Sequence, residues 1–347
     1  MRSIGFKIGN VSIGGGAPVT VQSMTNTDTR DAVKTTEQIL RLEEAGCEIV
    51  RFSVYDEQCA QAIPYIKAHT HIPLVADIHF DHRLAIAAIN NGIDKVRINP
   101  GNIGSEAKVR ELAAAAKDKG IPIRIGVNGG SLEKDILAEY GVTAEGMVES
   151  ALRHAAMLER CGFSDIVLSL KASTVSKTVE ACRIARERTA YPLHLGVTEA
   201  GAGEDAVVKS SIGIGSLLLD GIGDTVRVSL TGDPVREVYA AKRILKAIGL
   251  RSEGIEVISC PTCGRTRVDL PSIIEKINES LPKTDKPLRI AVMGCAVNGP
   301  GEAREADLGI AFGSNNAVVF KKGELCYSDR LPGVVDRFID DVRKELK

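Results

Sequence analysis

The first 250 residues alternate eight times between a short β-branched apolar run and a longer, Ala-rich stretch with helical spacing. The apolar runs cover 18–23, 48–54, 73–79, 95–100, 122–128, 165–171, 193–199 and 224–230. The helical stretches cover 32–45, 56–69, 81–91, 105–119, 143–161, 174–188, 203–218 and 234–248. Such alternation indicates a parallel sheet with helical crossovers, and eight units is the number that closes a barrel. The sequence therefore predicts a (β/α)8, or TIM, barrel.

Two further segments flank the eight units. Residues 1–17 have the pattern of a small β-hairpin, which we expect to plug the barrel. After the eighth unit come a strand, a cysteine-bearing loop, two helical stretches and several short strands. We therefore expect two domains, a barrel over residues 1–250 and an α+β module over residues 251–347. The rival topology for the first domain is an open, doubly wound sheet, but the pattern shows no break at mid-chain.

The balance of charge argues against a polyanionic surface as partner. The net charge is −1, aromatic residues make up 4% and Trp is absent, so we expect neither nucleic-acid nor membrane binding. The sequence has no signal peptide and no apolar run near the roughly 18 residues that span a bilayer. We therefore expect a cytoplasmic protein, whose eight cysteines are thiols or metal ligands rather than disulfides.

Polar side chains gather at the predicted C-terminal ends of the strands, where TIM-barrel active sites lie. They are Arg51, Ser53, Asp77, His79, Arg97, Asn99, Arg124, Asn128, Lys171, Glu199 and Ser229. Four of them are cations on separate strands and two are acids, which leaves a local charge of +2. Converging Arg side chains suit bidentate recognition of phosphate, so we expect a phosphate or diphosphate ester as ligand. The alternative is that they form surface salt bridges.

Two features of these strand ends suggest further roles. Glu199 is the single acid on its strand, and a carboxyl group near a reacting centre can donate or accept a proton. The alternative is that Glu199 pairs with one of the cations. Asp77 and His79 are two residues apart, so both point to the same side of their strand and suit a polar positioning pair.

Three cysteines in the second domain have the spacing of metal or cluster ligands. Cys260 and Cys263 form a C-x2-C motif, and Cys295 follows 32 residues later beside a Gly/Pro loop. The module contains no histidine, whereas a structural zinc site needs four Cys or His ligands. An iron–sulfur cluster with three thiolates and one open or oxygen-ligated iron fits better, and Glu302 is the nearest oxygen donor. A zinc site completed by Cys326 and a dithiol redox pair remain alternatives.

The other cysteines fall on helical stretches, where we expect them to be buried small hydrophobic residues. They are Cys47, Cys59, Cys161 and Cys182.

The strings SCPTCGRT and MGCAVNGPGEA, preceded by GVTEAG and VRVSLTG, closely resemble the 4-hydroxy-3-methylbut-2-en-1-yl diphosphate synthase family of the non-mevalonate isoprenoid pathway. The resemblance covers essentially the whole chain and is to the compact, two-domain bacterial form. It implies a reductive ring opening of 2-C-methyl-D-erythritol 2,4-cyclodiphosphate. Two electrons enter, water leaves, and the product is the linear 4-hydroxy-3-methylbut-2-enyl diphosphate.

The resemblance also implies roles for individual residues. A [4Fe–4S] cluster is expected on Cys260, Cys263, Cys295 and Glu302, with Glu302 as the labile ligand that substrate oxygen displaces. Glu199 is expected to protonate the leaving hydroxyl. The remaining strand-end residues are expected to contact the substrate or its diphosphate: Arg51, Asp77, His79, Arg97, Asn99, Arg124, Asn128, Lys171 and Ser229.

The family further implies partners and a fold for the second domain. The cluster module is expected to resemble the cluster domain of sulfite and nitrite reductases. A head-to-tail homodimer is implied, in which the module of one subunit closes over the barrel of the other, with flavodoxin or ferredoxin as electron donor. Two other functions stay open: a zinc-ribbon module on a phosphate-binding barrel, and a siroheme-dependent reductase, whose cluster normally has four cysteines.

Overall fold

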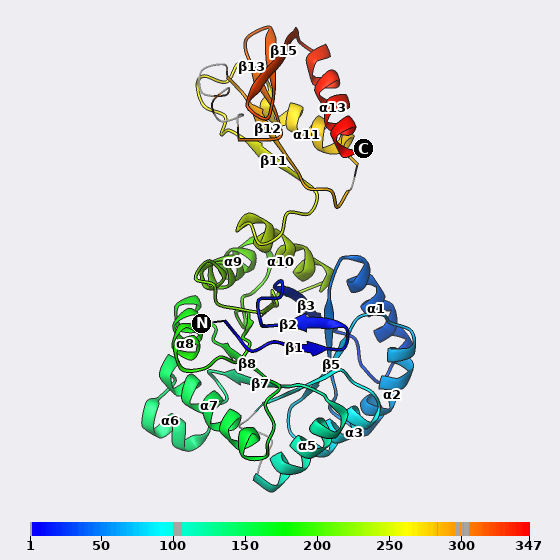
Figure 1. Ribbon diagram of the computed structural model, residues 1–347, viewed down its shortest axis with the longest axis vertical. Coiled ribbons are helices and arrows are strands. Elements are labelled where there is room, and N and C mark those ends of the chain that lie inside the picture. Colours follow the sequence, from blue (N-terminus) through cyan, green and yellow to red (C-terminus); the bar gives the residue numbers. More distant parts are fainter. Residues whose placement is uncertain (1, 100–105, 283, 296–298, 300, 302–304) are drawn as a thin grey trace. The chain divides into compact units, whose positions relative to one another are not determined.

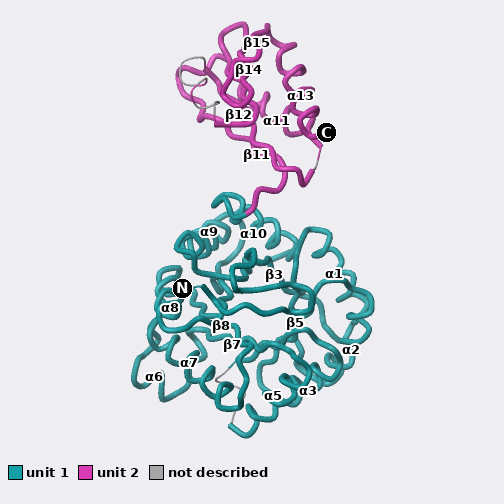
Figure 2. The backbone as a smooth tube through the Cα atoms, viewed as in Figure 1, with its two compact units in different colours: residues 1–250 teal, residues 251–347 magenta. Residues whose placement is uncertain are grey.

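The computed structural model describes residues 2–99, 106–282, 284–295, 299, 301 and 305–347. The chain divides into two compact units, residues 1–250 and 251–347, which are coloured separately in Figure 2. Of the helices that the structure describes, none is both long enough and apolar enough to cross a membrane.

Eight parallel strands form the first unit's barrel (Figure 1). They are β3 (Thr20–Met24), β4 (Ile49–Ser53), β5 (Leu74–Ile78), β6 (Lys95–Ile98), β7 (Ile123–Asn128), β8 (Ile166–Lys171), β9 (His194–Leu195) and β10 (Thr225–Val226). Hydrogen bonds join them in the order β8-β7-β6-β5-β4-β3-β10-β9. A parallel bridge between Leu168 and Leu193 links β8 to β9 and so closes the ring. The predicted (β/α)8 fold is confirmed.

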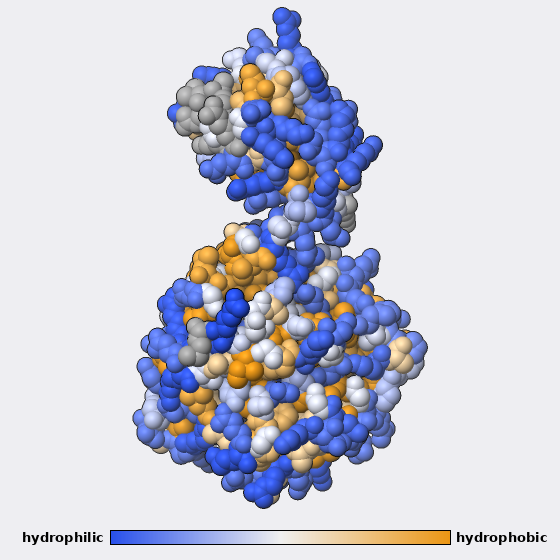
Figure 3. Space-filling view, in the orientation of Figure 1, coloured by the Kyte–Doolittle hydropathy of each residue, from blue (hydrophilic) through white to orange (hydrophobic). Residues whose placement is uncertain are grey.

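Helices surround the strands in the expected alternation. They are α1 (Ala32–Glu44), α2 (Glu57–Ala68), α3 (His82–Asn90), α5 (Glu106–Lys119), α7 (Ala144–Arg160), α8 (Val175–Arg188), α9 (Gly203–Leu219) and α10 (Val235–Ala247). The first three begin at aspartates, Asp31, Asp56 and Asp81, whose carboxylates accept from first-turn backbone N–H groups. A short additional helix, α6 (Lys134–Tyr140), follows β7 and was not foreseen from the sequence. Figure 3 shows apolar side chains over α9, which exposes Val208, Ile212 and Leu219.

The last two barrel strands are much shorter than the expected runs 193–199 and 224–230. β9 ends at Leu195, and four residues later Glu199 has a φ of 53°, which lies in the left-handed region. The segment after β10 is held by a side chain instead of a strand partner, since the Leu230 amide donates to Glu237 Oε1 at 3.1 Å. Both departures occur at the polar end of the barrel.

The expected N-terminal hairpin closes the other end of the barrel. Strands β1 (Phe6–Ile8) and β2 (Val11–Ile13) pair in antiparallel fashion, as the sequence predicted. Ile8 and Ile13 are fully buried and pack with the barrel residues Ile49, Val75 and Val167. The barrel is therefore apolar at its base, and its polar side chains lie at the opposite end.

The second unit is an α+β module. Its sheet has the order β11 (Ile255–Ser259), β12 (Leu288–Met293), β13 (Leu308–Phe312), β14 (Asn316–Lys321) and β15 (Glu324–Arg330). The first three strands are parallel and the last two pairings are antiparallel. Helices α11 (Leu270–Ser280) and α13 (Gly333–Leu346) contribute Ile277, Phe338 and Val342 to a core shared with the sheet.

Candidate active site

The C-terminal ends of the barrel strands enclose a cavity of about 230 Å³, here called the cationic cavity. It is lined by Met24, Arg51, Asp77, His79, Arg97, Arg124, Asn128, Ser169, Lys171, Thr198, Arg227 and Ser229. Every strand-end residue that the sequence nominated for substrate contact lines it, apart from Asn99. The barrel thus brings together side chains as far apart in the chain as Met24 and Ser229.

Asp77 is buried between two arginines. Nη1 of Arg97 donates to its Oδ1 at 2.9 Å, and Nε of Arg51 lies 3.5 Å from its Oδ2. Burial raises the pKa of Asp77, but the charges of Arg51 and Arg97 outweigh burial and hold the pKa below its ordinary value. Asp77 is therefore ionised, and it fixes the orientation of both guanidinium groups.

Arg124 lies deeper in the cavity and lacks such an acid. It is 1% exposed, and among the described residues its Nε and Nη1 have no hydrogen-bond partner. Burial, followed by the charges of Arg51 and Arg97, lowers the pKa of Arg124. Burial and the charge of Arg124 likewise lower the pKa of Lys171. Buried donors without acceptors are costly, so this end of the barrel is arranged for an anionic ligand.

Arg227 was missed in the sequence analysis. Its guanidinium forms two 3.1 Å hydrogen bonds with the carboxylate of Glu237, a buried residue of α10. The sequence did contain an indication of its role. Arg227 lies two residues before Ser229, so in an extended strand both side chains point to the same side. Arg227 adds a fifth cation to the lining of the cavity, and its partner Glu237 adds a third acid to the predicted set. The predicted excess of two positive charges is therefore unchanged.

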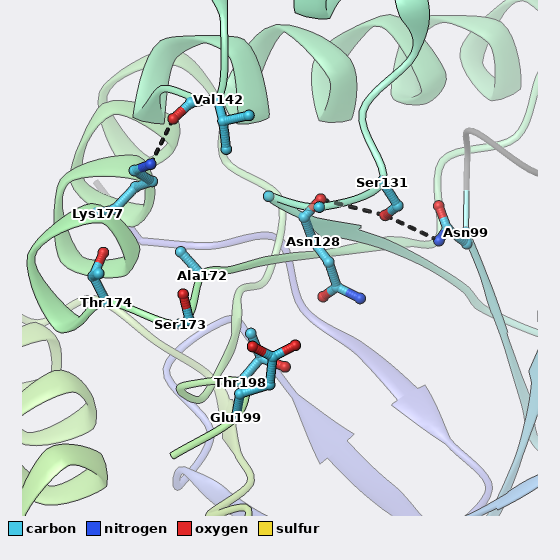
Figure 4. A pocket seen from close by; sticks show the side chains of 12 residues that line it. Asn99, Asn128, Ser131, Val142, Ala172, Ser173, Thr174, Lys177, Thr198 and Glu199 are labelled. Carbon is cyan, nitrogen blue, oxygen red and sulfur yellow. Dashed lines mark hydrogen bonds between the residues drawn. The ribbon is translucent and has the colours of Figure 1, made fainter. Parts of the chain in front are cut away.

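A second cavity of about 510 Å³, here called the polar cavity, adjoins the first and shares Asn128 and Thr198 with it (Figure 4). It is lined by Asn99, Asn128, Gly129, Gly130, Ser131, Val142, Ala172, Ser173, Thr174, Lys177, Thr198 and Glu199. Figure 4 shows the Asn128 carboxamide and the Glu199 carboxylate extending into the same space. Glu199 is exposed and forms no ion pair with a described cation, contrary to the pairing alternative.

The cysteine loops of the second unit meet through a backbone contact. The Gly294 amide donates to Sγ of Cys260 at 3.2 Å, which places the first cysteine loop beside the one that carries Cys295. Cys263 is exposed, and hydrogen bonds from Arg265 lower its pKa. Within the described part of the chain, no three His, Cys, Asp or Glu side chains form a group that could hold a metal ion. Glu302, the expected fourth ligand, lies outside the described residues.

Cys326 is not available as a fourth ligand. It is exposed on β15, at one edge of the five-stranded sheet, whereas Cys260 directly follows β11 at the other edge. Four strand spacings of about 4.8 Å separate the two edges by about 19 Å. A zinc site formed by Cys260, Cys263, Cys295 and Cys326 is therefore excluded, and the zinc-ribbon alternative that depended on Cys326 is wrong.

The remaining cysteines fit the expectation only in part. Cys59 and Cys182 are buried within helices, but Cys47 lies between α1 and β4, and Cys161 caps the end of α7 and is half-buried. Burial raises the pKa of Cys47 and Cys182 to about 12, so these thiols are protonated and unsuited to metal binding.

The fold and the cationic cavity define a class, the TIM-barrel proteins whose mouth is adapted to an anionic ligand. Residues 3–242 match the GcpE TIM-barrel domain, and residues 256–344 match the GcpE protein C-terminal domain. The chain belongs to the GcpE family.

Curated relatives are similar over nearly their whole length. A protein of Caldanaerobacter subterraneus subsp. tengcongensis is 57% identical over 99% of this chain and 97% of its own. One of Ruminiclostridium cellulolyticum is 56% identical over 97% of this chain and 96% of its own. Both are named 4-hydroxy-3-methylbut-2-en-1-yl diphosphate synthase (flavodoxin).

Solved structures show a more distant likeness. The N-acetylneuraminic acid synthetase of Leptospira borgpetersenii aligns with a TM-score of 0.51 at 13% identity, over 80% of this chain and 97% of its own. The dihydropteroate synthase of Yersinia pestis aligns with a TM-score of 0.51 at 11% identity, over 71% of this chain and 98% of its own. At this identity the likeness shows the fold alone.

Proposed function

We propose that this chain is an oxidoreductase that opens the ring of 2-C-methyl-D-erythritol 2,4-cyclodiphosphate and releases 4-hydroxy-3-methylbut-2-enyl diphosphate. Two electrons enter, a ring C–O bond breaks, and a hydroxyl group takes a proton and leaves as water. Membership of the GcpE family and the names of relatives at 57% and 56% identity support this activity.

The observation that carries the proposal is Arg124 inside the cationic cavity, whose Nε and Nη1 meet no acceptor in the described part of the chain. A diphosphate supplies acceptor oxygens for its free Nε and Nη1 and offsets the charge of Arg51, Arg97, Lys171 and Arg227. Asp77 keeps two of these guanidinium groups in fixed orientations, so part of the binding geometry is present before the substrate arrives. The site thus favours a compact dianion over a neutral ligand.

In this proposal the polar cavity receives the carbon skeleton and its hydroxyl groups. Glu199 holds the proton for the leaving hydroxyl, which accords with its place in that cavity and with the lack of a competing ion pair. Asn128 lines both cavities and contacts the substrate where the diphosphate joins the skeleton.

We assign Cys260, Cys263, Cys295 and Glu302 as the residues that hold a [4Fe–4S] cluster. The donor set is suitable, since thiolates are the usual ligands of such clusters and a backbone N–H already points at Cys260 Sγ. When bound, the cluster supplies the two electrons. Glu302 would be its single oxygen ligand and therefore the most readily displaced of the four.

We further propose flavodoxin as the electron donor, with ferredoxin as the alternative, because the names of both relatives include flavodoxin.

A head-to-tail homodimer is proposed on family grounds, and the exposed apolar side chains of α9 are of the kind found where chains associate. All eight cysteines lie in the described part of the chain and none of them forms a disulfide, which suits the reducing environment of the cytoplasm.

Anaerobic purification followed by iron and sulfide analysis and a turnover assay tests the function. The expected result is a brown protein that, with reduced flavodoxin, converts the cyclic diphosphate into the linear product detected by mass spectrometry. A colourless, iron-free protein after anaerobic reconstitution contradicts the cluster assignment. An iron-loaded protein without turnover contradicts the proposed activity. One zinc ion per chain, without iron, would support a structural zinc site in which a residue other than Cys326 is the fourth ligand.

A further inference from the structure

One wall of the polar cavity leads along the chain to a half-buried carboxylate that is hydrogen-bonded outside the cavity. The wall is the segment between β7 and α6, of which Gly129, Gly130 and Ser131 line the cavity. It ends at Glu133, which directly precedes α6. Glu133 is not among the residues that line either cavity.

Glu133 is placed for a contact with α7 and does not cap its own helix. It occupies the N-cap position of α6, yet its carboxylate forms no capping hydrogen bond. Instead Oε2 accepts from the Ser150 hydroxyl at 2.7 Å, and Oε1 lies 2.5 Å from Nε2 of His154. Ser150 and His154 are four residues apart and so share one face of α7. Both residues thus bind one carboxylate.

This contact is shielded from water, which makes it stronger than a surface pair. The side chains of His154 and Glu133 are 11% and 17% exposed, and Ser150 is 1% exposed. Burial raises the pKa of Glu133, but the hydrogen bonds from His154 and Ser150 outweigh burial and lower it to about 2. The carboxylate is therefore ionised at any physiological pH and remains a hydrogen-bond acceptor.

The wall is also fixed at two points nearer the cavity. The Gly129 amide donates to the Lys171 carbonyl at 3.1 Å. Ser131 Oγ donates to the Asn128 carbonyl at 3.3 Å and accepts from Asn99 Nδ2 at 3.2 Å, as drawn in Figure 4. Between these points and Glu133 lies only Leu132, so a shift of Glu133 is transmitted to Ser131 and then to Asn99 and Asn128.

We propose that Glu133, held by Ser150 and His154, is a positioning residue that fixes the wall of the polar cavity, the carboxamide of Asn99 and the backbone from which the Asn128 side chain extends. This inference rests on the proposed function, since both asparagines are assigned to substrate contact. Without the hydrogen bonds of Glu133 to Ser150 and His154, the wall can move. Substrate affinity then falls more than the rate of the chemical step.

The test compares Glu133→Ala, His154→Ala and His154→Gln with wild type in the cluster-loaded protein. The exposed pair of His71 and Glu43, with 3.0 Å between Nδ1 and Oε1, gives the matched control His71→Ala. Turnover is measured over a range of cyclic diphosphate concentrations, and Kd for the same compound by calorimetry. Thermal unfolding and iron content are recorded for every variant.

The two alanine variants are expected to raise KM and Kd about tenfold while kcat changes less than about twofold, because misplacement of binding groups costs affinity first. His154→Gln keeps an N–H donor and is expected to recover most of the loss. His71→Ala behaves as wild type. Unchanged KM and Kd in the alanine variants overturn the inference, as does a loss of activity that follows only the loss of folded protein.

The calorimetric measurement separates this inference from the proposed function. If wild type binds the cyclic diphosphate but does not convert it, the proposed reaction falls, and the ratio of the Kd values still decides the role of Glu133. A wild-type protein that neither binds nor converts the compound overturns both.

Discussion

Nε of Arg97 lies where a side chain on Gly126 would have to go, since a Cβ built on that glycine would be 2.5 Å from it. Lys171 and Gly196 are related in the same way, with 2.6 Å between the built Cβ and Nζ. In both cases a glycine leaves room for a buried cation at the barrel mouth. The shape of the cationic cavity thus depends on two residues that have no side chain.

Gly126→Ala is therefore expected to displace Arg97 and weaken its 2.9 Å contact with Asp77. We expect kcat/KM to fall about tenfold and the free energy of unfolding to drop by about 1–3 kcal/mol, the usual cost of overpacking. Steady-state kinetics and denaturant titration measure the two effects. Gly215→Ala on α9 is the control, because a Cβ there meets no atom within 4 Å. Kinetics like those of wild type in Gly126→Ala would show that Arg97 is free to move.

Arg124→Met should separate stability from binding. Removal of a buried cation that lacks an acceptor is expected to leave the free protein as stable as wild type, or more stable by about 1 kcal/mol. Affinity for the cyclic diphosphate is expected to fall about a hundredfold, since hydrogen bonds to charged groups contribute about 1.5–3 kcal/mol. Thermal unfolding with and without the compound measures both quantities. The control is Arg183→Met, which removes an exposed partner of Asp220. A destabilised Arg124→Met protein that still binds tightly contradicts the assignment.

The burial of His194 leads us to expect that the free energy of unfolding decreases at acidic pH. Burial, and after it the charges of Arg124 and Lys171, lowers the pKa of His194 well below 6.5. Below pH 6.5 the unfolded chain therefore binds a proton that the folded chain does not, so stability falls as the pH falls. The slope from this group reaches at most about 1.4 kcal/mol per pH unit at 25 °C.

His194→Asn should remove that part of the slope, as measured by denaturant titration between pH 6.5 and pH 5. Asn retains a group that can meet Thr225 Oγ1, which lies 2.7 Å from Nδ1 of His194. The exposed His69→Asn serves as control and should retain the wild-type slope. Equal slopes in His194→Asn and wild type would mean that the buried imidazole is protonated in the folded state.

The cluster assignment predicts opposite results for cysteines at the two edges of the second sheet. Cys260→Ser is expected to lose most of the iron after anaerobic reconstitution, because a thiolate ligand is removed. Cys326→Ser, at the far edge, should retain iron and turnover. Glu302→Ala should lower turnover more than iron content. Unchanged turnover in Glu302→Ala removes Glu302 from the mechanism, and iron loss in Cys326→Ser contradicts the sheet geometry.

Much of the fold follows from local sequence patterns. Eight periods of strand and helix predicted the barrel, because hydrophobic periodicity is a local property that acts over a few residues. Parallel strands in a closed barrel end at one face, so Arg51 and Arg97 could be placed together without coordinates.

Other features arise only from contacts between distant parts of the chain. The role of Arg227 depends on Glu237 of the next helix, and β9 ends at Leu195, well before the end of the predicted run. The exclusion of Cys326 needed the order of the strands.

The sequence by itself determined the barrel, the cations at its mouth and the three cysteines of the second unit. The tertiary structure decided that the mouth is divided into a cationic and a polar cavity, and that Glu133 is anchored by Ser150 and His154. The physical reason is the separation along the chain over which each kind of interaction acts. Periodicity and caps are set by neighbours along the chain, whereas cavity walls and buried ion pairs are set by packing between elements that the sequence does not place side by side.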